Sequence, residues 1–232
     1  MNASPAAASP AAPSTAAVAD ALVRLKLTAP TVALRPVFAG PPIAGPAIPV
    51  THLGSVDVIL EVLEDAAPGS ILVVDNGGRL DEACVGDLLA LETLLAGFAG
   101  IVIFGLHRDS TQLVDIGLPV WSLGAFARGP IRVPPAGSAM RAAVVDGHPV
   151  RTGDWVVADD DGVVFVYAAS WNAVRSSAES IIATELAQAS RMSGGTSLRE
   201  QIGFTEYLAI RAEQPSYSLR EHLAARGGAI ET

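Results

Sequence analysis

Residues 97–109 read GFAGIVIFGLHRD, and residues 69–78 earlier in the chain read GSILVVDNGG. Each stretch carries four consecutive large apolar residues between glycines, which is the length of a strand buried on both faces. Residues 86–96, between them, place leucines at helical spacing and end at Gly97, a typical helix stop. Apolar strands that alternate with helices predict parallel βαβ units, in which functional loops follow the carboxyl ends of the strands.

The alternation continues on both sides of this stretch. Pro46 and Pro49 make residues 45–50 a predicted edge strand, because proline has no N–H to donate to a neighbouring strand. Apolar periodicity and turn residues predict helices over residues 20–27, 56–66, 110–116 and 169–192, a helical segment over 197–213, and strands over 118–122, 142–145, 155–158 and 163–167. The last three strands are separated by Asp-Gly turns and predict an antiparallel layer packed against the first.

These elements predict one α/β domain over residues 20–232, with parallel βαβ units, a second mixed or antiparallel sheet and C-terminal helices. Residues 1–19 are rich in alanine, proline and serine and have no basic segment. They predict a disordered leader rather than a secretory signal.

The composition narrows the classes of function. The 232 residues carry a formal net charge of −9 and one lysine, Lys26, which disfavours non-specific nucleic-acid binding because that needs clustered cations. No apolar run approaches the roughly 20 residues that cross a bilayer. The one cysteine, Cys84, cannot form an internal disulfide. A cytoplasmic protein without membrane or nucleic-acid partners is therefore predicted.

Arg108 and Asp109 directly follow the second apolar strand, where a helix is predicted to begin. In a structural interpretation, Asp109 caps that helix and Arg108 is a surface residue. In a functional interpretation, Arg108 binds a substrate carboxylate bidentately and Asp109 is an oxygen ligand for a hard divalent cation. One protein carboxylate is sufficient for Mg²⁺, which keeps water and substrate as its other ligands.

Gly86 and Asp87 begin the leucine-rich helix, so Asp87 could be an ordinary N-terminal helix residue. Alternatively, free N–H groups at this helix end bind an anion, and Asp87 orients a water or acts as a general base. The residues alone support the two interpretations about equally.

Other polar motifs favour structural roles. The turn at residues 75–78 lacks a phosphate-loop pattern, and residues 159–162 lack the alternating ligands of an EF-hand, so a solvated turn is predicted there. Cys84 lies among acidic residues that would raise the pKa of its thiol, which predicts a structural thiol. The histidines share no metal-ligand spacing, and strand alternation is expected to turn His107 away from Arg108.

Taken in order, these motifs resemble the RraA-like family. That family contains class II 4-hydroxy-4-methyl-2-oxoglutarate and 4-carboxy-4-hydroxy-2-oxoadipate aldolases and the ribonuclease E activity regulator. The resemblance rests on Arg108-Asp109 and on residues 69–78, 83–87, 97–105, 117–120 and 153–164. It implies a swivelling-domain-like β/β/α fold, assembled as a trimer or a dimer of trimers with active sites between subunits.

For the aldolases, the resemblance implies Mg²⁺ or Mn²⁺ and a lyase that cleaves a 4-hydroxy-2-oxo acid to pyruvate through a stabilised enolate. The same chemistry would permit oxaloacetate decarboxylation. Carried over by position, Asp109 is the metal ligand, Arg108 contacts the oxo acid, and Asp87 is a water-mediated acid/base group.

The resemblance also implies that the backbone after Gly86, through Asp87, Leu88 and Leu89, binds the substrate carboxylate. A glutamate from a neighbouring subunit's C-terminal helix is expected near the metal's waters, and Glu185 is the best match.

Two departures from the family pattern affect the expected substrate. His107 replaces a small or aliphatic residue, and residues 31–36 lack a counterpart of an early aspartate. A second function stays open, because a non-catalytic regulator that binds a ribonuclease or helicase would share this fold. Another enzyme class acting on a sugar-derived or hydroxy acid would use the same anion pocket.

Overall fold

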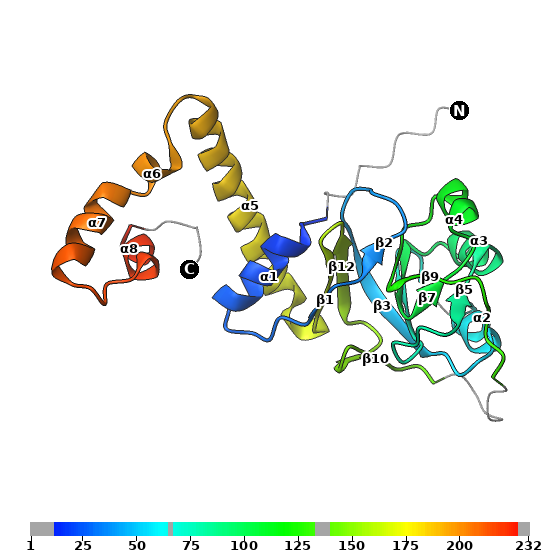
Figure 1. The fold of residues 1–232 in the computed structure, drawn as a ribbon. Helices are drawn as coiled ribbons and strands as arrows, with labels where there is room; N and C mark the ends of the chain where they lie inside the picture. Colours follow the sequence, from blue (N-terminus) through cyan, green and yellow to red (C-terminus); the bar gives the residue numbers. More distant parts are fainter. Residues whose placement is uncertain (1–11, 65–66, 133–139, 227–232) are drawn as a thin grey trace, which may run out of the picture.

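The computed structural model describes residues 12–64, 67–132 and 140–226. An eight-stranded mixed sheet forms its centre (Figure 1). Four neighbouring strands run parallel, namely β3 (Ile43–Thr51), β4 (Ile71–Asp75), β6 (Gly100–Phe104) and β8 (Val120–Ser122). Antiparallel strands extend both ends, namely β12 (Trp155–Asp159), β13 (Gly162–Val166) and β1 (Thr31–Val32) beyond β3, and β2 (Arg35–Pro36) beside β8. The predicted α/β class with parallel βαβ units is confirmed.

The sheet curls, so that its parallel and antiparallel halves face each other across one apolar core. Val73 and Val102 from the parallel half share this core with Val156 and Phe165 from the antiparallel half. The hairpin formed by β10 (Ala143–Val145) and β11 (His148–Val150) contributes further buried side chains. The predicted antiparallel layer is therefore present. Its strands β12 and β13 are hydrogen-bonded to the parallel strands through β3, whereas β10 pairs with β11 in a separate two-stranded sheet.

Two groups of helices cover the outer faces of the sheet (Figure 1). The parallel half is covered by α2 (Asp57–Leu63), α3 (Asp87–Leu95) and α4 (Ser110–Ile116). The antiparallel half is covered by α1 (Thr15–Arg24) and α5 (Trp171–Ser193), which follows the short 3-10 turn η1 (Ala168–Ser170). At the far end of α5, the chain continues away from the sheet as α6 (Leu198–Gln201), α7 (Phe204–Glu213) and α8 (Leu219–Ala225).

The edge-strand prediction for residues 45–50 is wrong, because β3 lies in the middle of the sheet. Its antiparallel register with β12 ends at Pro46, and its parallel register with β4 begins at Ala47. Pro46 therefore precedes the pairing with β4, and Pro49 follows the pairing with β12. Each proline is therefore paired with only one of the two neighbouring strands, so a central strand tolerates both.

The predicted boundary of the leader at residue 19 is too late, because α1 begins at Thr15. Asp159 accepts hydrogen bonds from the backbone N–H of Thr15 at 2.8 Å and from its hydroxyl at 2.6 Å. Asp159 is buried and anchors this helix, whereas Asp160 and Asp161, which connect β12 to β13, are exposed, as the predicted solvated turn requires. Residues 1–11 of the predicted leader lie outside the described residues.

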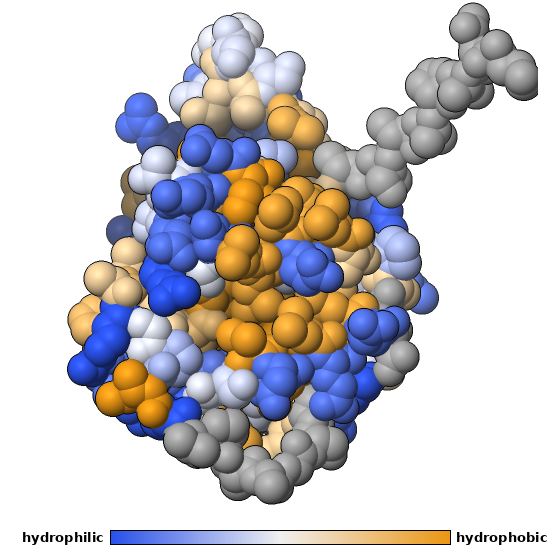
Figure 2. Space-filling model, turned by 90° about the vertical axis from the view of Figure 1, so that its right-hand side faces the viewer, coloured by the Kyte–Doolittle hydropathy of each residue, from blue (hydrophilic) through white to orange (hydrophobic). Residues whose placement is uncertain are grey.

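The face that carries α2, α3 and α4 exposes many apolar side chains. Figure 2 shows this face, with hydrophobic residues gathered at its centre. Leu88, Leu91 and Leu95 follow one another at helical spacing on α3, and Leu88 and Leu95 are 78% and 73% exposed. Within the described residues, every helix is too short or too polar to cross a lipid bilayer.

Candidate active site

A small parallel sheet brings the two glycine- and aspartate-containing motifs together. Its strands are β5 (Ala83–Val85), β7 (Leu106–His107) and β9 (Gly124–Ala125). The backbone N–H of Arg108 donates to the carbonyl of Val85 at 2.9 Å. Gly86 and Arg108 thus leave the carboxyl ends of neighbouring parallel strands. The short strands β5, β7 and β9 were not predicted, but they place the two motifs beside each other.

Gly86 is the point of closest approach between the motifs. A Cβ atom at this position would collide with Oδ2 of Asp109 and would lie 3.1 Å from Nε of Arg108. The backbone N–H of Asp87 faces the same Oδ2 atom at 3.4 Å. Any larger residue at position 86 would require the Asp109 carboxylate to move.

Asp109 precedes α4 in the left-handed conformation, with φ 59° and ψ 41°. Left-handed residues other than glycine are uncommon and cluster at functional sites. The Asp109 side chain makes no hydrogen bond that caps α4, and its carboxylate instead faces the N–H of Asp87 at the start of α3. The carboxylate lies 3.4 Å from Nε of Arg108, and the Arg108 and Asp109 side chains are 49% and 34% exposed.

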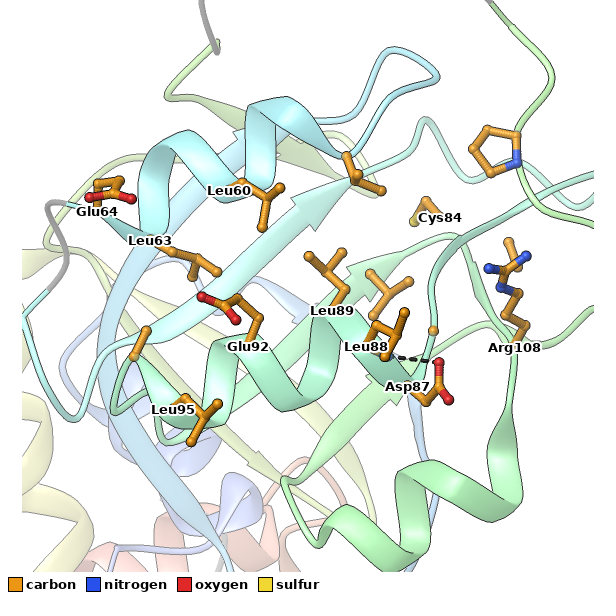
Figure 3. Close-up of a pocket in the computed structure, with 16 residues that line it drawn as sticks. Leu60, Leu63, Glu64, Cys84, Asp87, Leu88, Leu89, Glu92, Leu95 and Arg108 are labelled. Atoms are coloured by element: carbon orange, nitrogen blue, oxygen red, sulfur yellow. Dashed lines mark hydrogen bonds between the residues drawn. The ribbon is translucent and has the colours of Figure 1, made fainter.

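Arg108 lies at one end of a groove of about 860 Å³ between α2 and α3 (Figure 3). Asp87 lines the same end, while Leu63, Leu89 and Glu92 line the groove farther along. The groove was not predicted. The leucines distributed around the helix at residues 86–96 were the available signal, because a surface helix normally has a polar face.

The first turn of α3 already has hydrogen-bond partners. The N–H of Leu88 donates to Oδ1 of Asp87 at 2.7 Å, as Figure 3 marks, and the N–H of Asp87 faces Asp109. Two of the amides assigned to a substrate carboxylate are therefore engaged in this structure. An anion at this helix end would replace these contacts. The side chain of Leu89, the third of these residues, lines the groove.

Asp109 is the candidate metal ligand. Across residues 12–64, 67–132 and 140–226, no group of three His, Cys, Asp or Glu side chains is placed to hold an ion. A partly exposed carboxylate that does not cap its own helix, α4, fits Mg²⁺ or Mn²⁺, because such ions accept one protein oxygen and retain water ligands. Glu185 lies on α5, on the other side of the sheet from α4 (Figure 1). It does not join Asp109 within one chain, so its expected role across subunits stays a prediction.

His107 is buried, as strand alternation predicts, whereas Arg108 is half-exposed. Its Nδ1 lies 2.7 Å from the hydroxyl of Ser122, and its Nε2 lies 2.9 Å from the hydroxyl of Ser110. Burial lowers the pKa of His107, which favours a neutral ring. The ring thus connects β8 to the first residue of α4.

Cys84 is buried in the wall of the groove, and burial raises the pKa of its thiol to about 12. The thiolate needed for nucleophilic chemistry is strongly disfavoured at neutral pH. The prediction of a structural thiol is confirmed.

A buried polar cluster was missed. Glu82 forms an ion pair with Arg132, which also donates to Oδ1 of Asn76 at 3.0 Å. Nδ1 of His52 lies 2.8 Å from the same Oδ1 atom. The hydrogen bond from Arg132 lowers the pKa of Glu82, and burial lowers that of His52. His52 and Asn76 each directly follow a parallel strand, and this placement could have identified them from the sequence. No sequence pattern identified Arg132.

We expect Gly86→Ala to lose both stability and the geometry of the site. The added Cβ would overlap Oδ2 of Asp109, so the Asp109 carboxylate must leave its position beside Arg108 and the N–H of Asp87. Overpacking of this kind costs about 1–3 kcal/mol of unfolding free energy. Urea unfolding measures the change, with Gly40→Ala as the control because a Cβ there has nothing within 4 Å. Equal stability of the two variants would contradict the close approach.

Comparison with known proteins places this geometry in a family. A model of the RraA-like family, described as Aldolase/RraA, matches residues 15–165. A protein of Laribacter hongkongensis is 40% identical over 108 residues, covering 46% of this chain and 66% of that protein. One of Alkalilimnicola ehrlichii is 37% identical over 108 residues, covering 46% and 65%. Both carry the provisional name 4-hydroxy-4-methyl-2-oxoglutarate aldolase, and the chain matches slightly less than two thirds of their length.

Solved structures give the same result. A protein of Pseudomonas syringae pv. tomato superposes with a TM-score of 0.73 at 26% identity, covering 81% of this chain and 92% of that one. RraAS2 of Streptomyces coelicolor, described as an unusual member of the RNase ES inhibitor RraA family, superposes with a TM-score of 0.66 at 27% identity, covering 77% and 91%. The family model spans well over half of the residues, and the chain therefore belongs to the RraA-like family.

Proposed function

We propose that this protein is a divalent-metal-dependent lyase that cleaves a 4-hydroxy-2-oxo acid to pyruvate. One observation carries the proposal. Arg108 and the Asp109 carboxylate, which does not cap α4, lie against Gly86 at the end of a groove large enough for a small acid. The provisional aldolase names of the relatives support the same class of reaction.

Each residue has a chemical task in this proposal. Arg108 presents planar N–H donors that match a carboxylate or an enolate oxygen. Asp109 would hold Mg²⁺ or Mn²⁺, which when bound supplies an electrophile for negative charge developing at the 2-oxo group. Asp87, through a water, takes the proton of the 4-hydroxyl. The C3–C4 bond then breaks to give a carbonyl fragment and the enolate of pyruvate, and the proton returns to C3.

Two further points follow from this chemistry. Breaking the C3–C4 bond of oxaloacetate would release CO₂ and the same enolate, so oxaloacetate decarboxylation belongs to the proposal. A Schiff-base route is disfavoured because Lys26, the chain's one lysine, follows α1 on the antiparallel side of the sheet. We place the reaction in the cytoplasm, in keeping with one buried, unpaired cysteine.

Pyruvate release tests the proposal. The full chain is incubated with 4-hydroxy-2-oxo acids or oxaloacetate, first with Mg²⁺ or Mn²⁺ and then with excess EDTA. We expect pyruvate in the metal-containing reactions and its loss on chelation. Absence of metal-dependent turnover with every 2-oxo acid would reject the lyase.

We further propose a homotrimer or homohexamer whose active sites lie between subunits. The stripe of Leu88, Leu91 and Leu95 on the face shown in Figure 2 supports it, because exposed apolar patches of this kind mark interfaces. Assembly across this face would also cover the open side of the groove.

The assembly proposal predicts that Leu91→Glu dissociates the oligomer. Leu91 is part of the stripe but does not line the groove, so the change addresses assembly and not substrate binding. Light scattering after size exclusion measures the mass, and Val144→Glu on β10 is the control because Val144 is also exposed. A monomeric parent protein, or an oligomer unchanged by Leu91→Glu, would contradict this interface.

A regulator of ribonuclease activity is the second candidate. The likeness to RraAS2 and to a Thermus RNA-processing inhibitor RraA, with a TM-score of 0.53 and 26% identity, favours it. Binding a ribonuclease does not require an arginine beside a carboxylate that could hold a metal ion, so the Arg108-Asp109 pair favours the lyase. Ribonuclease binding in a pull-down, without metal-dependent turnover, would reverse this preference.

A further inference from the structure

The groove extends well beyond the end that holds Arg108. It continues between α2 and α3, and its volume of about 860 Å³ is in the range that accommodates ligands much larger than pyruvate. Figure 3 shows Arg108 and Asp87 at one end and Leu63 and Glu64 towards the other. A substrate anchored by its carboxylate at Arg108 would therefore direct its remaining atoms along α3.

The charges along the groove are unequal. Among the described residues that line it, Arg108 is the one cation, whereas Glu64, Asp87 and Glu92 carry carboxylates. Glu92 follows Asp87 by five residues, so it lies about 7.5 Å farther along the helix axis. A second carboxylate on the substrate would meet Glu92 and find no cation among the described residues with which this chain lines the groove, which is unfavourable in a partly desolvated groove.

The remaining walls are apolar. Leu63 and Leu89 are nearly buried beneath the groove, and Leu60 and Leu95 form its exposed rim. An alkyl or aryl group lying here would bury apolar surface on both partners, and each buried methylene stabilises binding by about 0.8 kcal/mol. The groove thus combines an anion-binding end with an uncharged, apolar continuation.

We propose that the substrate is a 2-oxo monocarboxylate whose C4 carries an uncharged apolar substituent, held between α2 and α3. This inference rests on the proposed function for the site, and it departs from the dicarboxylic acid in the names of the relatives. Arg108 selects the oxo-acid end, and Glu92 with its leucine neighbours selects against a distal carboxylate.

Two probes of matched shape test the inference by binding alone. One is 2-oxoglutarate, and the other is 5-methyl-2-oxohexanoate, in which an isopropyl group replaces the distal carboxylate. Calorimetric titration of the full chain in Mg²⁺ is expected to show about tenfold or tighter binding of the isopropyl probe. Equal or tighter binding of 2-oxoglutarate overturns the inference, as does failure of both probes to bind.

A charge reversal in the groove assigns the effect to Glu92. Glu92→Arg supplies the missing cation, and we expect it to shift the binding ratio at least tenfold towards 2-oxoglutarate. Asp115→Arg on α4 makes the same charge change outside the groove lining and should leave the ratio unchanged. An unmoved ratio in Glu92→Arg, as when a neighbouring subunit fills the groove, overturns the inference.

The binding ratio and the lyase reaction can fail separately. Preference for the isopropyl probe without cleavage of any 4-hydroxy-2-oxo acid supports the groove assignment and rejects the lyase. Pyruvate release combined with tighter binding of 2-oxoglutarate supports the lyase and overturns the inference.

Discussion

Arg108→Ala is expected to lower kcat/KM for pyruvate release by about 100- to 1,000-fold, the usual cost of removing one donor aimed at developing negative charge. The guanidinium lies at the end of the groove beside Gly86, where it can hold the oxo-acid end of a substrate. Its side chain is half-exposed, so unfolding free energy should change by no more than about 0.5 kcal/mol. Steady-state kinetics and urea unfolding measure the two quantities.

Arg175→Ala is the matched control for this variant. Arg175 is an exposed arginine paired with Glu179 on α5, far from the groove, and an exposed pair contributes little to stability. Its activity should equal that of the parent protein. Arg108→Ala with undiminished turnover would remove Arg108 from the mechanism.

Asp109→Asn is expected to weaken Mg²⁺ binding by about 100-fold or more. The substitution keeps the shape of the side chain but removes the charge that attracts a hard cation. Asparagine adopts the left-handed conformation readily, so the turn before α4 should persist. Calorimetric titration with Mg²⁺, and the rise in Tm that saturating Mg²⁺ produces, measure the loss.

Asp115→Asn on α4 serves as the control, because it removes an exposed carboxylate outside the groove. Its Mg²⁺ affinity should match that of the parent protein. If Asp109→Asn binds Mg²⁺ as tightly as the parent protein, the cation site lies elsewhere.

Local patterns in the sequence predicted most of the parallel half of the fold. Continuous apolar runs bounded by glycines identified β4 and β6, and the helix expected at residues 110–116 has those bounds in the structure. Glycines or turn residues mark the ends of both strands, and a continuous apolar run of this length is typical of a strand buried on both faces.

The errors arose where tertiary context decides. Proline argued for an edge at β3, but a change of partner strand within β3 lets proline sit centrally. The N-terminus of α1 has a local cap, Ser14, which the sequence contained but the prediction did not use, and Thr15 is also bound by Asp159, a residue far along the chain. Gly203 divides the helical segment predicted for residues 197–213, because it adopts a φ of 64° between α6 and α7.

The sequence predicted that the two motifs lie together, but it did not predict the groove beside them. The rule that loops meet at the carboxyl ends of parallel strands correctly brought Gly86 and Arg108 together. The groove required knowing that α2 lies beside α3, and no local pattern records that contact. His52 and His222 are both buried, and each lies within hydrogen-bond distance of a polar partner in another part of the chain.

A crystal structure with Mg²⁺ and pyruvate tests most directly whether the two motifs form one site. We predict that the ion contacts the Asp109 carboxylate, that the guanidinium of Arg108 contacts pyruvate, and that both lie against Gly86. Ion and pyruvate bound at separate places, or pyruvate bound away from Arg108, would contradict the central claim.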